Sequence, residues 1–234
     1  MAIFFWTLHV ISGQSPRVND TTMPVDTLRL WATYYYIPQM NHDPAGADLL
    51  DKNNTPTGLK LTKENWCKAA IEGTVMIRKD GKSHLLNYHS RSKELQVDCR
   101  PYIQSKNFNG HNKAGRVLWS KSTGYGKGTE NYQLYPFKSI AVDRSVIPIG
   151  SVIFIPAAEG IEYLTVTGKL VKHDGYFFAV DVGSAILGNH IDVFLGITTQ
   201  SPFPFITSTP DGTFDAYIVD DNEKALELAK LHGK

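Results

Sequence analysis

The chain has no strong excess of charge of either sign and no long apolar run, and each shortage argues against a class of function. Its 234 residues include 24 Lys or Arg and 23 Asp or Glu, which gives a formal net charge of +1. The charges are mixed along the chain, so binding to nucleic acid through phosphate neutralisation is not expected. No apolar run has the length needed to cross a bilayer, and no transmembrane body is expected.

Cysteine is scarce as well. Cys67 and Cys99 are the only two, and neither belongs to a CxxC or Cys/His pattern suited to zinc or thiol redox chemistry. We therefore predict no metal and no cofactor. The pair fits either a structural disulfide in an oxidising compartment or two unpaired buried thiols in any compartment, and the sequence leaves both open.

Strand patterns dominate what is present. Hydrophobic residues make up 42% of the chain, enough for one main domain. Segments rich in β-branched and aromatic residues, separated by Gly, Pro, Asn and Asp, predict a mainly β protein. These segments are LRLWATYYYIP, GTVMIR, HLLNYH, SVIFIP, EYLTVTGKLV, YFFAVDVG, HIDVFLG and FDAYIVD.

Helical periodicity is confined to two places. NEKALELAKLH follows a cap at Asp221 or Asn222, and we expect this C-terminal helix, within residues 222–234, to pack on the outside. LTKENWCKAAIEG is a weaker candidate capped by Thr62. Residues 1–24 are expected to be an N-terminal extension or the remnant of a signal peptide, because they begin with an apolar run too short to span a bilayer. No Lys or Arg precedes this run, and its Phe, Trp, Thr, Val and Ile residues fit a packed N-terminal strand equally well.

Polar, turn-rich sequence occupies residues 41–57 and 107–131. The second stretch contains GYGKG, which has neither the spacing nor the following Lys-Ser/Thr of a phosphate-binding loop. We expect a flexible surface loop there, bordering a groove.

Three aspartates lie beside apolar, β-branched neighbours: Asp143 in AVDRSVIPIGS, and Asp181 and Asp192 within AVDVGSAILGNHIDVFLG. A carboxylate in such a setting is costly unless it is hydrogen-bonded or protonated. Taken singly, each is also explained as a turn or strand-end residue that accepts backbone N–H groups. Three together call for a functional explanation.

These segments resemble a known family. Asp143-Arg144-Ser145 leads to Ile147-Pro148 and Gly150, and Asp181-Val182-Gly183 leads to His190, Asp192 and Val193. This arrangement is similar to the three-aspartate (3D) domain of membrane-bound lytic transglycosylase A and its relatives. Upstream, Thr33, Tyr35, Tyr36 and Pro38 resemble the family's Thr-Gly-Tyr-Tyr-x-Pro strand, with Tyr34 where glycine is usual.

The resemblance implies a six-stranded double-psi β-barrel built from residues 25–40 and 136–221, with residues 41–135 as an inserted smaller lobe. It also implies cleavage of the β-1,4 bond between N-acetylmuramic acid and N-acetylglucosamine in peptidoglycan, with formation of a 1,6-anhydro end. The partner is then a peptidoglycan glycan strand, and the protein acts outside the cytoplasm, in the periplasm or envelope or as a secreted protein. The oligomeric state is not predicted.

The resemblance also assigns roles. Asp192 is the acid and then the base, Asp181 supports it, and Asp143 is the third member of the catalytic set with a mainly architectural part. Substrate binding is expected from a set that combines the upstream strand with the loop around His190, namely Thr33, Tyr35, Gly183, Ser184, Ala185 and His190. Two alternatives stay open: a barrel that binds glycan or a protein without cutting, and a hydrolytic muramidase that uses Asp192 and Asp181.

Overall fold

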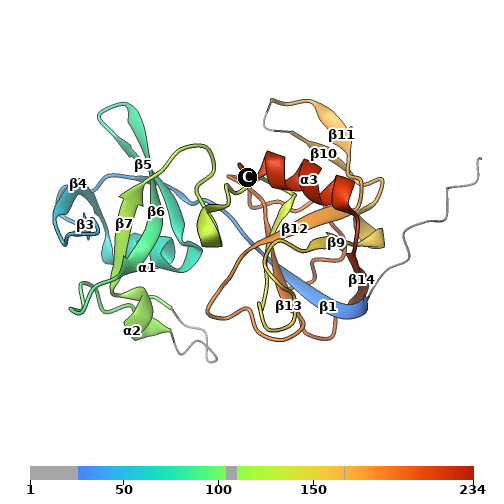
Figure 1. Cartoon of the computed structure of the whole chain (residues 1–234). Coiled ribbons are helices and arrows are strands. Elements are labelled where there is room, and N and C mark those ends of the chain that lie inside the picture. Colours follow the sequence, from blue (N-terminus) through green and yellow to red (C-terminus); the bar gives the residue numbers. More distant parts are fainter. Residues whose placement is uncertain (1–25, 104–109, 166) are drawn as a thin grey trace, which may run out of the picture.

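The computed structural model describes residues 26–103, 110–165 and 167–234. The predicted N-terminal extension or signal remnant at residues 1–24 lies outside them. Figure 1 shows a closed barrel beside a second, smaller lobe, with helix α3 lying over the barrel. In the described part of the chain, no helix combines the length and apolar character needed to cross a membrane.

Six strands close the barrel in the order β1, β13, β8, β12, β9 and β14. This confirms the predicted mainly β fold with a six-stranded barrel. The pairs β1–β13 and β8–β12 are parallel, and the other four are antiparallel. The strands are β1 (Asp26–Tyr35), β8 (Ser139–Ala141), β9 (Val152–Phe154), β12 (Tyr176–Asp181), β13 (His190–Phe194) and β14 (Phe214–Val219).

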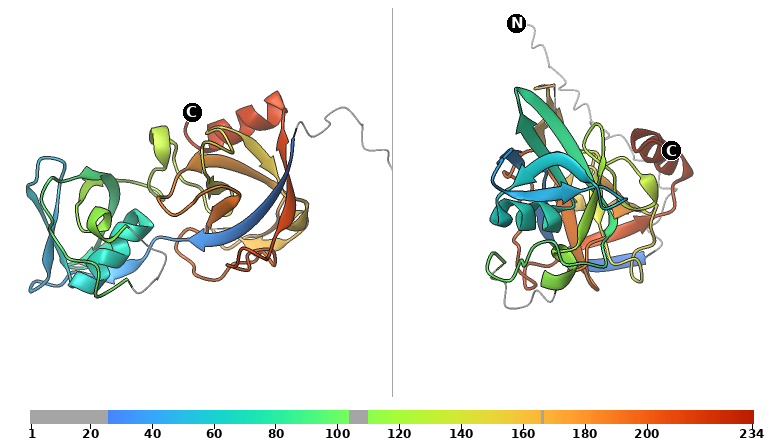
Figure 2. Two further views of the ribbon diagram at one scale, coloured as in Figure 1. Left: turned by 90° about the horizontal axis from the view of Figure 1, so that it is seen from below. Right: turned by 90° about the vertical axis from the view of Figure 1, so that its left-hand side faces the viewer.

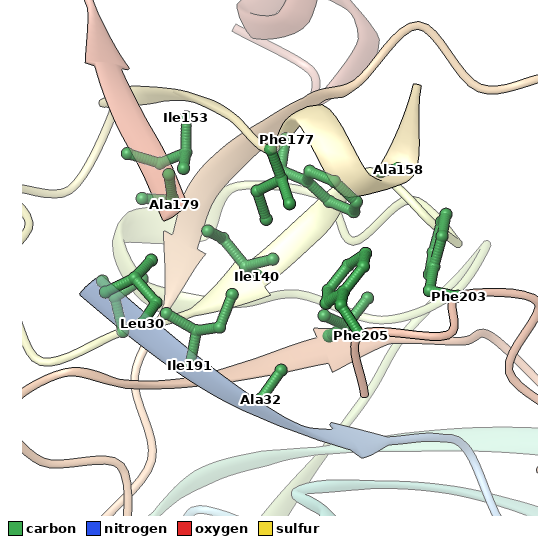
Figure 3. Close-up of a cluster of buried hydrophobic side chains, with 14 of the residues drawn as sticks. Leu30, Ala32, Ile140, Ile153, Ala158, Phe177, Ala179, Ile191, Phe203 and Phe205 are labelled. Atoms are coloured by element: carbon green, nitrogen blue, oxygen red, sulfur yellow. The ribbon is translucent and has the colours of Figure 1, made fainter. Parts of the chain in front are cut away.

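The barrel interior is filled by alternate side chains of these strands. Ala32, Ile140, Ala179 and Ile191 are fully buried, and Figure 3 shows them converging inside the barrel. Each buried Ile or Leu contributes about 1.5–3 kcal/mol relative to an exposed position. Because side chains on a strand alternate between its two faces, the residues next to these interior positions face outward.

The second lobe has its own sheet and core. Its four strands lie in the order β2 (Gln39–Asn41), β5 (Thr74–Lys79), β6 (Lys82–Arg91) and β7 (Val117–Lys121), beside the hairpin β3 (Ala47–Leu50) and β4 (Pro56–Leu61). Helix α1 (Lys63–Glu72) and the short α2 (His111–Ala114) complete it. Cys67 on α1 forms a disulfide with Cys99, so the two cysteines are paired and are not free buried thiols.

Two crossings connect the lobes. On the way out, β1 ends at Tyr35 and β2 begins at Gln39, so the chain leaves the barrel at residues 36–38, before the predicted boundary after residue 40. Figure 2 shows β1 running from the barrel toward the second lobe. The return crossing follows β7 and includes the 3-10 turn η1 (Thr129–Asn131).

Helix α3 (Asn222–Leu231) packs against β9 and β12, and buries Leu228. Its cap is Asp221, whose side chain accepts from Lys224 N, and Thr62 caps α1 in the same way by accepting from Asn65 N. Both caps were among those predicted. His232, just past α3, is buried, and its Nε2 lies 2.9 Å from Ser139 Oγ in the barrel.

Several elements differ from the sequence-based expectation. The run EYLTVTGKLV is not one strand but a hairpin of β10 (Glu162–Leu164) and β11 (Leu170–Lys172), and the 3-10 turn η2 (Pro156–Ala158) precedes it. Two stretches were predicted to be loop, residues 41–57 and 107–131. Strand β3 lies in the first of them and β7 in the second. β8 was missed because three residues are too few to show a period.

Candidate active site

A row of four residues crosses the outer face of the barrel. Thr33 on β1 pairs with Asp192 on β13, Asp192 pairs with Ala141 on β8, and Ala141 pairs with Asp181 on β12. Paired residues on neighbouring strands present their side chains to the same face. The two aspartates therefore flank the small side chain of Ala141, about two strand spacings, or ~10 Å, apart at their backbones.

Asp181 reaches this row because of an irregularity in β12. Ala179 is an interior residue, so strict alternation would direct Asp181 inward as well. The register with β8 shifts between Ala179 and Asp181, which is the signature of a β-bulge. A bulge re-aims the side chains that follow it. Here it brings Asp181 to the face that carries Asp192.

Asp192 ends a chain of hydrogen bonds. Its Oδ1 lies 2.7 Å from Thr33 Oγ1, which lies 2.8 Å from His190 Nε2, while His190 Nδ1 faces the carbonyl of Ala185 at 3.3 Å. The imidazole stacks on Trp31, with ring centroids 3.6 Å apart and an angle of 6° between the planes. His190 is therefore a fixed, hydrogen-bonded member of the site.

These hydrogen bonds are compatible with either protonation state of Asp192. The Thr33 hydroxyl donates to Asp192 Oδ1, so a proton on Asp192 is carried by Oδ2, and His190 Nε2–H can donate to Thr33 Oγ1. Burial lowers the pKa of His190, which favours the neutral imidazole. The geometry thus accommodates a protonated Asp192.

Asp181 is held by separate partners. The Tyr35 hydroxyl donates to its Oδ2 at 3.0 Å, and Val182 N donates to its Oδ1 at 2.8 Å. The backbone of Thr129 in the return crossing also lowers the pKa of Asp181. Just before Thr129, a Cβ on Gly128 would lie 2.3 Å from the carbonyl of Val180. The predicted flexible loop is therefore packed directly against the acidic site.

The two carboxyls differ in proton affinity. Burial, together with the charge of Asp181, raises the pKa of Asp192 to about 7 against the opposing effect of Thr33. Burial raises the pKa of Asp181 to about 6, although its hydrogen bonds lower it. Near neutral pH, Asp192 thus keeps its proton longer than Asp181. Two carboxyls with separated pKa values are the pattern of an acid and its ionised support.

The third aspartate holds the loops around the site. Asp143 Oδ1 accepts from Ser145 N at 2.9 Å and from its hydroxyl at 2.6 Å, and Oδ2 accepts from Gly188 N at 2.8 Å. These bonds lower the pKa of Asp143. The loop that it fixes also contains exposed Ser184 and Ala185. A Cβ on Gly183 would lie 2.6 Å from Ile186, so that turn needs glycine.

A residue of the second lobe also belongs to the site, and the sequence patterns did not indicate it. Glu72, the last residue of α1, accepts from Tyr36 N at 3.2 Å. Burial, together with the charge of Asp192, raises the pKa of Glu72 to about 7. Lys68, one turn earlier on α1, lies over the Tyr36 ring with its Nζ 5.6 Å from the ring centroid. The acidic site therefore lies where the lobes meet.

A cavity of about 550 Å³ adjoins this junction on the second lobe. Its lining is mostly polar and comprises Tyr36, Pro38, Gln39, Met40, Asn41, His42, Asp43, Pro44, Thr62, Asn65 and Lys68. Among residues 26–103, 110–165 and 167–234, no group of three His, Cys, Asp or Glu side chains is arranged to hold a metal ion.

Fold and site together define a β-barrel protein with a pair of half-buried carboxyls suited to acid–base chemistry. Residues 138–202 match the 3D domain family, so the chain carries a 3D domain that includes Asp143, Asp181 and Asp192. Comparison with curated protein sequences finds no match.

Solved structures similar to this chain include lytic transglycosylases. MltA of Escherichia coli with bound chitohexaose is 15% identical with a TM-score of 0.51, over 82% of this chain and 72% of that one. A membrane-bound lytic murein transglycosylase from Agrobacterium tumefaciens is 16% identical with a TM-score of 0.47, over 86% and 78%. LtgG of Burkholderia pseudomallei is 16% identical with a TM-score of 0.39, over 82% and 71%. At these identities, the likeness to E. coli MltA is one of fold.

Proposed function

We propose that this protein is a peptidoglycan lytic transglycosylase. It would cleave the β-1,4 bond between N-acetylmuramic acid and N-acetylglucosamine and leave a 1,6-anhydro end. The observation that carries the proposal is the in-register row of Thr33, Asp192, Ala141 and Asp181, in which the acid with the higher pKa stands beside one that ionises first. The 3D domain and the glycan bound by E. coli MltA support the choice of substrate.

In this proposal, the proton of Asp192 moves to the bridging oxygen as the bond from that oxygen to the anomeric carbon breaks. Asp192, now ionised, accepts the proton of the C6 hydroxyl of the same sugar while that oxygen bonds to the anomeric carbon. The nucleophile is already tethered to the ring, so one carboxyl serves as acid and then as base. An ordinary glycosidase needs a second carboxyl as nucleophile or to activate water.

Asp181 would stabilise positive charge that develops at the anomeric carbon, because it ionises at a lower pH than Asp192. Tyr35 keeps Asp181 in place, and burial and the charge of Asp181 raise the pKa of the Tyr35 hydroxyl, so it stays a donor. Asp143 has a supporting role through Gly188. Backbone groups at residues 183–185 would bind acetamido groups of the glycan.

The strand would pass from the barrel over Tyr36 to the polar cavity of the second lobe. Tyr34 is 38% exposed and offers a stacking face at the position where the family usually has glycine. We therefore propose the barrel as the catalytic domain and the inserted lobe as the second wall of the binding groove. Since the substrate is peptidoglycan, the proposed place of action lies outside the cytoplasm, in the envelope or after secretion.

The test is product analysis on purified peptidoglycan. The native protein should release muropeptides with 1,6-anhydro ends, identified by mass spectrometry. Asp192→Asn keeps the size of the side chain but cannot donate the proton, so the rate should fall by about 10²–10⁴-fold. Asp220→Asn, the same change at an exposed position after β14, is the matched control and should leave the rate unchanged.

Each alternative gives a different product. A hydrolytic muramidase would release reducing ends instead of anhydro ends, and a binding barrel would release nothing while still retaining glycan. Full activity of Asp192→Asn would show that the acid has been wrongly assigned.

A further inference from the structure

We propose that the free edge of strand β2 binds the acidic peptide stem that peptidoglycan carries on its N-acetylmuramic acid residues, and that Lys68 and Arg78 bind the carboxylates of this stem. The inference rests on the proposed function, because its ligand is part of that same substrate. It assigns one edge of the second lobe to the peptide of the strand instead of its sugars.

Strand β2 lies at the edge of the four-stranded sheet, and β5 is its one strand partner in the part of the chain that the structure describes. Met76 N on β5 donates to the carbonyl of Pro38 at 3.0 Å, and His42 N donates back to β5 at 2.9 Å. Backbone groups alternate between the two sides of a strand, so those of Gln39 and Asn41 point away from β5. Such a row of open N–H and C=O groups is a template for an extended peptide.

A cavity lies on each face of the sheet beside this edge, and all three residues of β2 line both cavities. The larger one, of about 550 Å³, also contains Lys68 of α1, and the second, of about 220 Å³, contains Arg78 of β5. Met40 packs with α1 in the core of the lobe, whereas Met76, which lines the second cavity, packs against the barrel. A peptide along β2 therefore has space for its side groups on both faces.

Each cavity contributes one cation. Lys68 and Arg78 are both exposed, and neither forms an ion pair with any described residue. Glu64 and Glu72 lie one turn away from Lys68 on either side along α1, but the lysine Nζ lies over the ring of Tyr36, 5.6 Å from its centroid. Unpaired Lys and Arg side chains bind carboxylates through charge-assisted hydrogen bonds. The two cavities are thus suited to an acidic peptide.

The remaining polar groups of the larger cavity also match such a stem. His42 Nδ1 accepts from Lys60 N at 2.9 Å, so the proton of the neutral imidazole is on Nε2, where it is a donor. Asp43 is the one carboxylate in the two linings, and its Oδ1 accepts from Ala45 N at 3.0 Å. An uncrosslinked stem carries several carboxylates and one free amino group on its diamino residue. Two cations and one carboxylate complement that distribution of charge.

The edge lies within reach of a stem attached at the acidic site. Thr33 Oγ1 donates to Asp192 at 2.7 Å, and Gln39 follows Thr33 by six residues, which span at most about 20 Å. Tyr36, between them, lines the larger cavity. A stem of four or five residues extends over about 13–18 Å. A stem on an N-acetylmuramic acid bound beside Asp192 can therefore reach β2.

The first experiment measures binding of a synthetic stem tetrapeptide, L-Ala–γ-D-Glu–meso-diaminopimelate–D-Ala, to the full chain by amide NMR titration. Three proteins are compared: native, the double variant Lys68→Gln/Arg78→Gln, and the control Lys63→Gln/Lys82→Gln. The control removes the same two charges from exposed positions of the second lobe that line neither cavity.

In native protein we expect saturable shifts of the Gln39 and Asn41 amide signals. Loss of two exposed ion pairs should weaken binding about 10-fold in Lys68→Gln/Arg78→Gln, while the control stays within about twofold of native. Absence of saturable shifts at these amides, or equal weakening in the control, would overturn the proposal. Equal shifts with an N-acetylglucosamine hexamer would also overturn it, because they would assign the edge to sugar.

The second experiment compares release of anhydro products from glycan strands that keep their stems and from strands whose stems an amidase has removed. Native protein should show about 10-fold higher kcat/KM on the strands with stems. Lys68→Gln/Arg78→Gln should lose this preference and keep the native rate on bare strands. Equal native rates on the two substrates, or an equal loss on both in the double variant, would contradict the assignment. If native protein releases no anhydro product, the proposed function fails, and the peptide titration alone decides whether β2 binds the stem.

Discussion

Thr33 has a single hydroxyl proton and two neighbours that can accept it, Asp192 at 2.7 Å and His190 at 2.8 Å. The hydroxyl donates to Asp192 Oδ1. A hydrogen bond to an ionised carboxyl is charge-assisted and stronger than one to the neutral acid, which explains why Thr33 lowers the pKa of Asp192.

Thr33→Val should consequently raise the pKa of Asp192. The alkaline limb of the pH profile of kcat/KM for release of anhydro products should move toward higher pH, by up to about one unit. The rate should also fall, since Asp192 and His190 lose their common partner. A profile that shifts toward lower pH would contradict this account of the Thr33 bond.

At the scale of elements, the return crossing supports the site. Asn87 of β6 accepts from Lys127 N at 2.7 Å and donates to its carbonyl at 3.0 Å, which anchors the crossing to the second lobe. One residue later, Gly128 lies against β12, where a Cβ would come within 2.3 Å of Val180 O and 3.2 Å of Asp181. The crossing thus sits between β6 and Asp181.

Gly128→Ala should destabilise the fold by about 1–3 kcal/mol, because the added methyl group must displace backbone. Activity per folded molecule should also fall, since Asp181 moves with β12. Gly124→Ala in the same loop is the control. Its φ of +63° costs about 1 kcal/mol, but the Cβ meets open space, so activity should be retained. Urea unfolding and product release measure the two effects, and equal loss of activity in both variants would contradict the prediction.

Some of these elements could be predicted from local sequence patterns, and others could not. The apolar alternation around Ile191 and the caps at Thr62 and Asp221 are local patterns, and each predicted its element correctly. The bulge in β12 depends on pairing with β8, which is only three residues long. Glu72 could not be assigned to the site, because its hydrogen bond from Tyr36 N depends on how two lobes pack and no local pattern encodes that.

At the scale of the whole molecule, buried histidines set how stability responds to acid. His173 is 2% exposed; its Nε2 faces the Phe137 carbonyl at 2.8 Å, and its Nδ1 accepts from Gly175 N at 2.9 Å. Burial lowers its pKa to about 4, and the charge of Lys138 acts in the same direction. The folded protein therefore holds this imidazole neutral.

A folded-state pKa below the unfolded value makes protonation favour unfolding. The contribution of His173 is present above about pH 6.5 and is lost as the pH falls toward 4, by up to about 1.4 kcal/mol per unit. Asp181, Asp192 and Glu72, whose pKa values are raised, contribute the opposite slope over the same range, in native protein and variants alike. Urea unfolding at pH 6.5, 5.5 and 4.5 should therefore show the effect of His173 as a difference. The free energy of unfolding of His173→Gln should lie below the native value at pH 6.5 and approach it as the pH falls, while the exposed-site control His89→Gln should keep the native slope. A constant difference between His173→Gln and native protein would contradict this account.

The pairing of β1 has a consequence for the order in which a newly made chain matures. Thr33 leaves the ribosome 159 residues before Asp192, and β1 stays without its neighbours until β13 and β14 have been synthesised. The second lobe is contiguous by comparison, and its disulfide closes over a separation of 32 residues. An unfinished chain can therefore complete that lobe early, while the acidic row forms only when translation is almost over.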